Sequence, residues 1–364
     1  MHKLRDLRPQ RLRNAALAFS ILALTAGGVG TALLVYHYGF KVIADALVAV
    51  GMAGFAAVTA FHLGIVTACG VAWFVLVPQP DRPSPWAFIL GRMVRNGASE
   101  ALPLSQAGGF IMGARAATAA GLPGAMSVAS TVVDITMELL GELIFVGIAL
   151  AILARLHPGT ALEGWVATGL VGATAVATVY AMAQRRGFTL IERVANRAPQ
   201  GAGLAAGAAT LQGCIDHIYG RLRGPVLGFL MHLTCWLASA VEAWFALGLM
   251  GAAPGFAVVL SIEGLVTGAR ALAFAVPGAL GVQEAAHVFV GAMFGVSADA
   301  LLALSLLKRA RDLVLGLPPL VAWQFLEGNL FWHNRSAPRE DTSDTRDTSQ
   351  AAAALADEHR HRIV

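Results

Sequence analysis

Long uninterrupted apolar runs alternate along the chain with short stretches rich in arginine, proline or glycine. Several runs reach the roughly 20 residues that carry an α-helix across a bilayer. The runs that predict full crossings are Ala15–Tyr36, Ala44–Val77, Ala125–Leu153, Gly164–Ala183, Pro225–Met250 and Ala298–Trp323. The second run is longer than one crossing needs, so we expect it to tilt or to bend near Gly51, Gly54 or Gly64.

Two pairs of shorter apolar segments are each interrupted by a proline, which ends or kinks a helix. Pro103 separates the first pair, which covers residues 86–120, and Pro277 separates the second, which covers residues 255–293. We favour two re-entrant helical hairpins; the alternative is that each pair forms two short, tilted crossings. The residues expected at the breaks are Pro103, Gly108, Gly109, Pro277, Gly278 and Gly281.

The second half of the chain repeats the plan of the first. A shift of 174 positions (277 minus 103) moves Pro103 onto Pro277 and Gly121 onto Gly295, and the order of elements also matches. Three crossings separate the starts of the copies, so the copies run in opposite directions. The predicted fold is all-α: a polytopic membrane helical bundle with an inverted internal repeat, an arrangement typical of transporters with a site at the midplane.

The same pattern divides the chain into parts. We expect a basic cytoplasmic N-terminus at residues 1–14, an integral membrane domain at 15–328 and a disordered cytoplasmic tail at 329–364. Repeat one covers about 44–153 and repeat two about 225–323, with a cytoplasmic connector at 184–224. Most arginines fall in the stretches placed inside, so the positive-inside rule puts both termini in the cytoplasm.

Composition excludes an ordinary soluble enzyme. Of the 364 residues, 57% are apolar and 13% are charged, against about 25% charge in soluble domains. The net charge of +4 therefore concerns membrane orientation rather than nucleic acid, and we expect no nucleic-acid partner.

Ionisable residues inside the predicted spans are the main functional signal, because each costs about 2.5–3.5 kcal/mol at mid-bilayer unless it is paired or hydrated. Asp134, Glu138 and Glu142 recur every four residues, which places them on one helix face. Acids and bases nearly balance, so they either pair structurally or line a polar cavity for an ion or a lipid headgroup. The cavity candidates are Arg92, Arg95, Asn96, Glu100, Arg115, Asp134, Glu138, Glu142, Glu263, Arg270, Gln283, Glu284, Lys308, Arg309 and Asp312.

Other chemistry is not signalled. Cys69, Cys214 and Cys235 have no metal-ligand spacing, so we interpret them as packing residues and expect no metal and no cofactor. His62 and His232 lie singly in apolar segments, as does His287, where a hydrogen-bonded structural role is more common than a ligand role. No catalytic motif is present, so no catalytic residue is assigned.

At the two broken pairs the sequence resembles a known family. The stretch from Asn96 through Pro103 and Gly108-Gly109 to Asp134 and Glu138 is similar to the transmembrane domain of lysylphosphatidylglycerol synthases, a flippase-like superfamily. A second signature runs from Pro277-Gly-Ala-Leu-Gly281 to Lys308 and Asp312. Within the superfamily the chain looks closest to HpnL, a membrane protein associated with hopanoid biosynthesis. Ala279 departs from the family's usual Pro-Gly-Gly turn.

The resemblance implies a multi-pass protein of the bacterial inner membrane that handles lipids. No aminoacyltransferase domain follows in this chain, so lysyl transfer is not expected. The leading hypothesis is a lipid flippase or transporter linked to hopanoid or other polar lipids, with membrane lipids (hopanoid, phospholipid or a lipid-linked headgroup) as partners. The alternatives are a non-transporting subunit that organises lipid-biosynthesis enzymes and an intramembrane lipid transferase.

Overall fold

The computed structural model describes residues 40–80, 82–101, 105–156, 202–252, 254–273 and 279–336, together with Tyr36, Val276 and several positions between 168 and 180. Its elements are helices, and this part of the chain contains no strand. They are α2 (Phe40–Leu76), α3 (Pro85–Ala101), α4 (Ser105–Ala119), α5 (Gly124–Leu156), α7 (Ala202–Tyr219), α8 (Arg223–Leu249), α9 (Phe256–Leu272), α10 (Val282–Met293) and α11 (Ala298–Ser336). The chain divides into two compact units, residues 1–320 and 321–364.

Three described helices are long and apolar enough to cross a membrane: Val48–Leu76 of α2, and all of α5 and α8. The chain is therefore an all-α membrane protein, as its hydropathy pattern predicts. The expected crossing Ala298–Trp323 lies in α11 but is not among the three; four charged residues from Lys308 to Asp312 interrupt its apolar surface. The expected crossings at 15–36 and 164–183 fall mostly outside the described residues, and α11 continues past residue 328 to Ser336.

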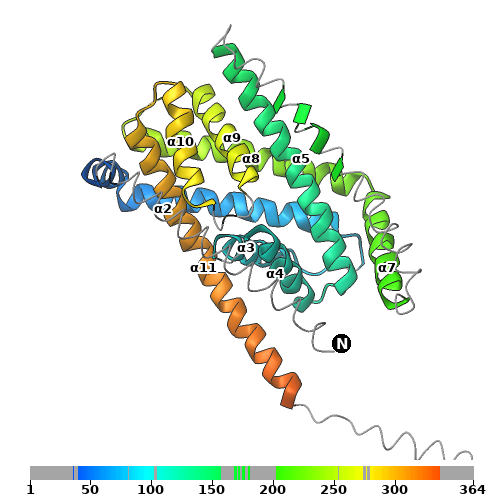
Figure 1. Ribbon diagram of the computed structural model, residues 1–364. Helices are drawn as coiled ribbons and strands as arrows, with labels where there is room; N and C mark the ends of the chain where they lie inside the picture. Colours follow the sequence, from blue (N-terminus) through cyan, green and yellow to red (C-terminus); the bar gives the residue numbers. More distant parts are fainter. Residues whose placement is uncertain are drawn as a thin grey trace, which may run out of the picture. The chain divides into compact units, whose positions relative to one another are not determined.

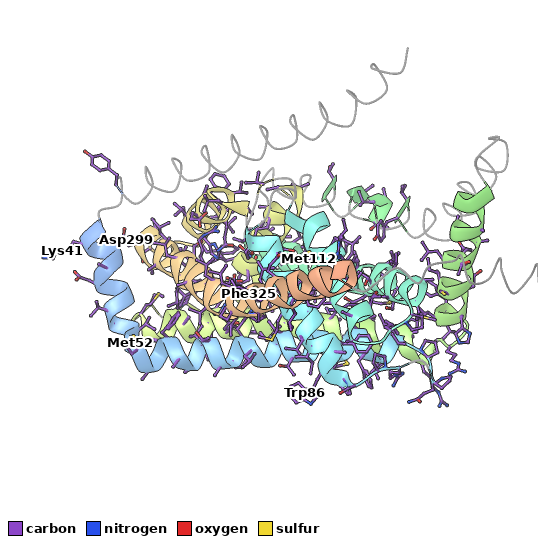
Figure 2. The ribbon with its side chains drawn as sticks, turned by 90° about the horizontal axis from the view of Figure 1, so that it is seen from below. Lys41, Met52, Trp86, Met112, Asp299 and Phe325 are labelled. Carbon is purple, nitrogen blue, oxygen red and sulfur yellow. The ribbon has the colours of Figure 1, made fainter. Side chains whose placement is uncertain are left out.

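The bend expected in α2 occurs at Gly51. Its φ of 63° lies in the left-handed region, which glycine enters without a steric penalty from Cβ. Figure 2 shows the segment that carries Lys41 turning away from the rest of α2 at Met52. The straight part of α2 therefore begins close to Met52.

Helices α2 and α8, the first helices of the two repeats, pack against each other in opposite directions (Figure 1). Gly54 near the start of α2 lies beside Leu249 at the end of α8. At the other end of the pair, a Cβ on Gly224 would lie 2.9 Å from the carbonyl oxygen of Val75. Equivalent helices of the two repeats thus run antiparallel, as the inverted repeat predicts.

The element boundaries follow the same repeat. Helices α3 and α9 each have 17 residues. The shift of 174 positions moves the end of α4 at Ala119 onto the end of α10 at Met293, and the start of α5 onto the start of α11. Gly121 and Gly295, which the shift superimposes, both have positive φ, 101° and 67°. The turns into the long helices are therefore alike in both halves.

Helices α3 and α4 form an antiparallel hairpin beside α2. The hairpin starts at the C-terminal end of α2, where Gly70 would place a Cβ 2.6 Å from the Cα of Ile89. It returns to the same end, where Leu122, just after α4, packs in one cluster with Trp73. Glu100, one residue before the end of α3, lines the same cavity as His62, which lies halfway along the span of α2. This is the geometry of a re-entrant hairpin.

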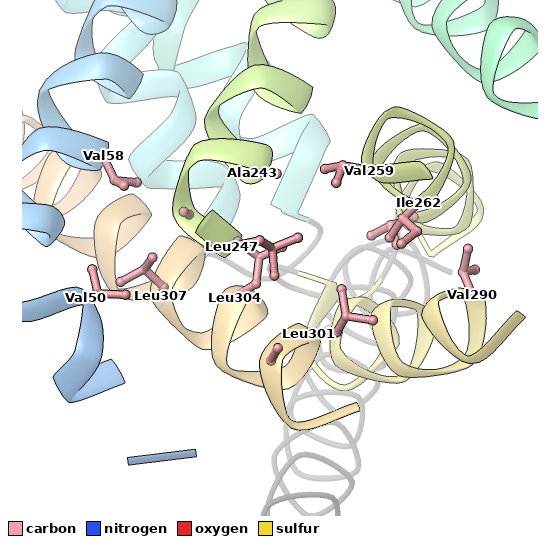
Figure 3. Close-up of a cluster of buried hydrophobic side chains, with 13 residues drawn as sticks. Val50, Val58, Ala243, Leu247, Val259, Ile262, Val290, Leu301, Leu304 and Leu307 are labelled. Atoms are coloured by element: carbon pink, nitrogen blue, oxygen red, sulfur yellow. The ribbon is translucent and has the colours of Figure 1, made fainter. Parts of the chain in front are cut away.

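Helices α9 and α10 form the second hairpin, which starts at the C-terminal end of α8. Trp244 of α8 contacts Phe256, the first residue of α9, with ring centroids 6.0 Å apart. Side chains of α2, α8, α9, α10 and α11 then form one apolar cluster around Leu247 and Leu301 (Figure 3). Because α2 and α8 are antiparallel, the two hairpins enter from opposite ends of the pair, and their tips approach each other between them.

Two residues at the breaks differ from expectation. Gly108 and Gly109 lie inside α4 rather than in the break before it. The reason is packing: a Cβ on Gly109 would collide with the hydroxyl of Ser99 on α3. Gly281 does end the second break, as the N-cap of α10 with a φ of 79°. Pro103, Pro277 and Gly278 lie outside the described residues.

Candidate functional site

A cavity of about 610 Å³ lies between the hairpin tips and the antiparallel pair α2 and α8. This volume is within the range of roughly 300–1,000 Å³ seen for ligand pockets. Polar and charged side chains from both repeats line it: His62, Arg92, Arg95, Asn96, Ser99, Glu100, Glu138, Glu142, Tyr180, His232, Ser239, Thr267, Arg270, Arg311 and Asp312.

One wall of the cavity is an ion-pair cluster that joins α3 to α5. The guanidinium of Arg92 donates to both carboxylate oxygens of Glu138, at 3.0 and 2.5 Å. The guanidinium of Arg95 donates to Asp134 at 2.9 Å and to Glu138 at 2.5 Å, and it stacks on the ring of Phe110. Such forked arginine–carboxylate contacts fix geometry as well as charge. They fasten the first hairpin to the long helix that follows it.

His232 of α8 extends this first cluster into the second repeat. Its Nε2 lies 2.8 Å from Oδ1 of Asp134, and both side chains are almost fully buried. Asp134 is therefore shared between Arg95 and His232, which connects α3, α5 and α8 through one carboxylate.

The opposite wall is a second cluster, built by α2, α8 and α11. Arg311 donates to Glu242 and, at 2.8 and 3.0 Å, to its neighbour Asp312. Nδ1 of His62 lies 2.8 Å from Glu242, and its Nε2 lies 3.7 Å from Asp312. Glu242 and Asp312 thus each contact both Arg311 and His62, and these contacts join the three helices.

A third group of pairs lies behind the cavity and fastens the second hairpin to α11. Glu263 of α9 contacts Lys308 of α11 and accepts a bond from His287 of α10 at 3.2 Å. The carboxylate of Glu284 accepts from Arg309 at 2.8 and 2.9 Å and from the backbone N–H of Gly281 at 2.8 Å. The glutamate therefore both caps α10 and ties it to the neighbouring helix.

An ion pair between described residues joins the two hairpins near their tips. Arg270, near the end of α9, donates to Glu100, near the end of α3, at 3.2 Å. Their side chains are more exposed than those in the clusters, 32% for Arg270 and 18% for Glu100. Arg309 lies 4.0 Å from the same glutamate. The Arg270–Glu100 pair thus joins the two repeats at the cavity, because both residues line it.

Helix α11 closes against the first hairpin by backbone contact. A Cβ on Gly97 of α3 would collide with the carbonyl of Gly316. Small residues at such crossings let helices approach closely in membrane proteins. This contact seals the cavity beside the tip of α3.

The structure brings together eight of the predicted site residues at the cavity itself: Arg92, Arg95, Asn96, Glu100, Glu138, Glu142, Arg270 and Asp312. Asp134 belongs to the first cluster but does not itself line the cavity. Glu263, Gln283, Glu284, Lys308 and Arg309 lie in the pairs behind the cavity, and Gln283 donates to Ser305 of α11 at 3.0 Å. Arg115 lies on the exposed side of α4, away from the cavity. Most of these charges thus pair with one another, and a polar cavity lies among them.

Five residues that line the cavity were not among the cavity candidates predicted from the sequence. His62, His232 and Arg311 line the cavity, and so do the thiols of Cys69 and Cys235. The three intramembrane histidines are hydrogen-bonded to acids, as expected for structural residues. The position of His62 and His232 beside the cavity depends on the packing of α2 against α8, which no local motif encodes. The described residues contain no group of histidine, cysteine and acidic side chains that could hold a metal ion.

The fold and the cavity define a class: helical membrane proteins in which two oppositely inserted hairpins enclose a charged cavity. The family model described as "Lysylphosphatidylglycerol synthase TM region" matches residues 14–319, and the chain belongs to this family. It is therefore a membrane protein of a lipid-related family. A search of curated proteins found no match, and a search of solved structures found none.

Proposed function

We propose that this protein moves polar lipids between the two leaflets of a bacterial inner membrane without hydrolysing ATP. The observation that supports the proposal most is the position of the cavity. It lies halfway along an antiparallel pair of spans and is enclosed by hairpins from opposite ends. Crossing the apolar layer is the main barrier for a headgroup, and a charged, roomy cavity at that level lowers the barrier.

In this mechanism the headgroup enters the cavity while the acyl chains stay in the surrounding lipid. The first cluster holds α3 to α5, and the pairs behind the cavity hold α9 and α10 to α11, so each hairpin can move together with a long helix of its own repeat. The Glu100–Arg270 contact between the tips would break and re-form as the cavity opens towards one end of α2 or the other. Rocking of one repeat against the other is how inverted-repeat transporters alternate access.

We also propose where the protein lies and which group of lipids it moves. Both termini would lie in the cytoplasm, and the lipid would be a hopanoid or another polar lipid of the same membrane, as the family resemblance implies. Comparison of the lipid content of both leaflets in cells with and without the protein tests this part. An unchanged distribution of each lipid class would contradict it.

Reconstituted vesicles test the transport step directly. Lipids labelled on an acyl chain are incorporated in both leaflets, and a membrane-impermeant quencher reports how fast inner-leaflet label reaches the surface. Protein-containing vesicles should lose nearly all fluorescence, whereas protein-free vesicles should lose about half. Arg270→Gln should slow exchange, because it removes the ion pair between the tips and a cation of the cavity.

A matched control is Arg155→Gln, which removes an exposed arginine at the end of α5 that does not line the cavity. Exchange by this variant should equal that of the wild type. Failure of the wild-type protein to move any of several headgroup classes would overturn the proposal and favour the non-transporting subunit.

A further inference from the structure

The charged groups that line the cavity are not equally satisfied. Arg92 and Arg95 are each held by two carboxylate contacts, and Arg311 is held by Glu242 and Asp312. A guanidinium has five N–H donors. Arg92 and Arg95 each donate two hydrogen bonds to carboxylates and Arg311 donates three, while Nε of Arg92 is buried without a partner in the described part of the chain.

Among the described arginines that line the cavity, Arg270 donates the fewest hydrogen bonds to the protein. Among the described residues it makes one hydrogen bond, from Nη2 to Glu100 at 3.2 Å. Its side chain is also the most exposed of the four described arginines that line the cavity, at 32%. Arginine matches the geometry of a phosphate group, with two parallel N–H donors available to one face of the anion.

Glu142 is the acid with no partner. It lines the cavity from α5, one turn after Glu138, yet within the described part of the chain it makes no hydrogen bond or ion pair. Its charged neighbours are Glu138 and Arg270. The register of α5 against α9 agrees with this, because Val146 lies beside Gly268, so the preceding turn of α5 lies beside the end of α9.

Helix packing does not require a carboxylate at this place. The shift of 174 positions moves Glu142 onto Gly316, where the second repeat instead closes backbone to backbone on Gly97. The repeats therefore differ at this position: one is sealed by glycine and the other carries an acid that faces a cavity. An unpaired carboxylate in such a place is costly without a ligand.

An aromatic wall adjoins Glu142. Trp236 of α8 lines the cavity, and its indole stacks on Phe145, one turn after Glu142, with ring centroids 6.1 Å apart. Tyr180 also lines the cavity. A carboxylate beside an indole is a good site for an ammonium group, through charge and through the cation–π interaction.

We infer that the cavity binds the zwitterionic headgroup of a phospholipid, with its phosphate on Arg270 and its ammonium on Glu142 beside Trp236. This inference rests on the proposed function and names the chemical class of its substrate. An ammonium and a phosphate separated by a short linker would satisfy both spare groups without adding a net charge to the cavity. A headgroup that carries phosphate but no ammonium would leave Glu142 unpaired.

Equilibrium binding in detergent tests the inference apart from transport. The probes are phosphatidylethanolamine and phosphatidylglycerol, which carry the same acyl label and differ only in the headgroup. The wild-type protein should bind the ethanolamine lipid more tightly. Glu142→Gln should weaken that binding about tenfold, as expected for loss of one charge-assisted hydrogen bond, and leave glycerol-lipid binding unchanged.

Two variants and a soluble competitor complete the test. Glu142→Asp should restore most of the preference, and Asp216→Asn, a matched change of an exposed acid on α7, should not alter it. Glycerophosphoethanolamine, which has the headgroup without the chains, should compete only weakly, because the inference concerns a lipid. Strong competition would show a soluble phosphoester site and overturn it.

The two proposals can fail separately. If Glu142→Gln leaves the ratio of the two lipid affinities unchanged, the zwitterion inference is wrong even when vesicles show exchange. If the wild-type protein binds the ethanolamine lipid in a Glu142-dependent way but vesicles show no exchange, the transport function is wrong and the site stands.

Discussion

The pair of Glu263 and Lys308 offers a quantitative test of how buried charges hold the second hairpin. The side chain of Glu263 is 2% exposed and that of Lys308 is 11% exposed, and they are in direct contact. Lys308→Met keeps most of the side-chain volume but leaves a buried carboxylate with His287, at 3.2 Å, as its remaining partner. Breaking a buried pair by removing one member costs about 3–5 kcal/mol.

An ordinary hydrogen bond between membrane helices is worth far less, about 0.6 kcal/mol on average and about 1.7 at most. The two descriptions of the pair therefore predict different losses. We expect Lys308→Met to lower the free energy of unfolding by about 3 kcal/mol. The double variant Glu263→Gln/Lys308→Met removes both charges and should lie within about 1 kcal/mol of the wild type.

The assay is unfolding of the purified protein in mixed micelles by increasing fractions of denaturing detergent, followed by far-ultraviolet circular dichroism. The four proteins of the double-mutant cycle give the coupling free energy directly. A loss below about 1 kcal/mol for Lys308→Met, or strictly additive effects in the double variant, would refute the argument that an uncompensated charge dominates.

Two further predictions use the same unfolding measurement, and a third uses cysteine cross-linking. Gly97→Ala should destabilise the protein by about 1–3 kcal/mol, because the added methyl group would collide with Gly316. Gly207→Ala on α7, where a Cβ meets nothing within 4 Å, should not destabilise it. Equal stability of the two variants would contradict the close crossing of α3 and α11. Ala279 has a φ of 46°, so Ala279→Gly should raise stability by about 0.5 kcal/mol, since relief of left-handed strain exceeds the added chain entropy; a loss would mean that the turn is unstrained. With the native cysteines replaced, cysteines at positions 54 and 249 should cross-link on oxidation and those at 54 and 224 should not, because α2 and α8 are antiparallel; the reverse outcome would exclude the inverted packing.

The architecture was predictable where it depends on patterns that repeat along the chain. Apolar run lengths predicted α2, α5 and α8, and the proline positions predicted two hairpins of matching place in each half. The bend at Gly51 was predictable because α2 exceeds one crossing. Gly108 and Gly109 show the limit of this reasoning: a glycine can mark a break in a helix or a close contact within one, and only the neighbouring α3 decides between them.

The site was predictable in composition but not in pairing. An acid in an apolar span needs a partner, and the sequence therefore identified Asp134, Glu138 and Asp312 as unusual. It could not show that His232 bonds Asp134 or that His62 bonds Glu242, because these residues are separated by 98 and 180 positions. Nor could it separate Glu142, which has no partner among the described residues, from Glu138, one turn earlier and fully paired.

The two repeats carry their hairpin-to-helix pairs with opposite polarity. When α3 is aligned with α9 from their first residues, Arg92 corresponds to Glu263; when α5 is aligned with α11 in the same way, Asp134 corresponds to Lys308. Exchanging the two repeats therefore reverses the sign of these charges, and the electric potential is not symmetric about the middle of the cavity. If lipids move as proposed, a dipolar headgroup would bind away from the centre of the cavity and enter it from the two leaflets at different rates. Without an energy source, its final distribution between the leaflets would be unaffected.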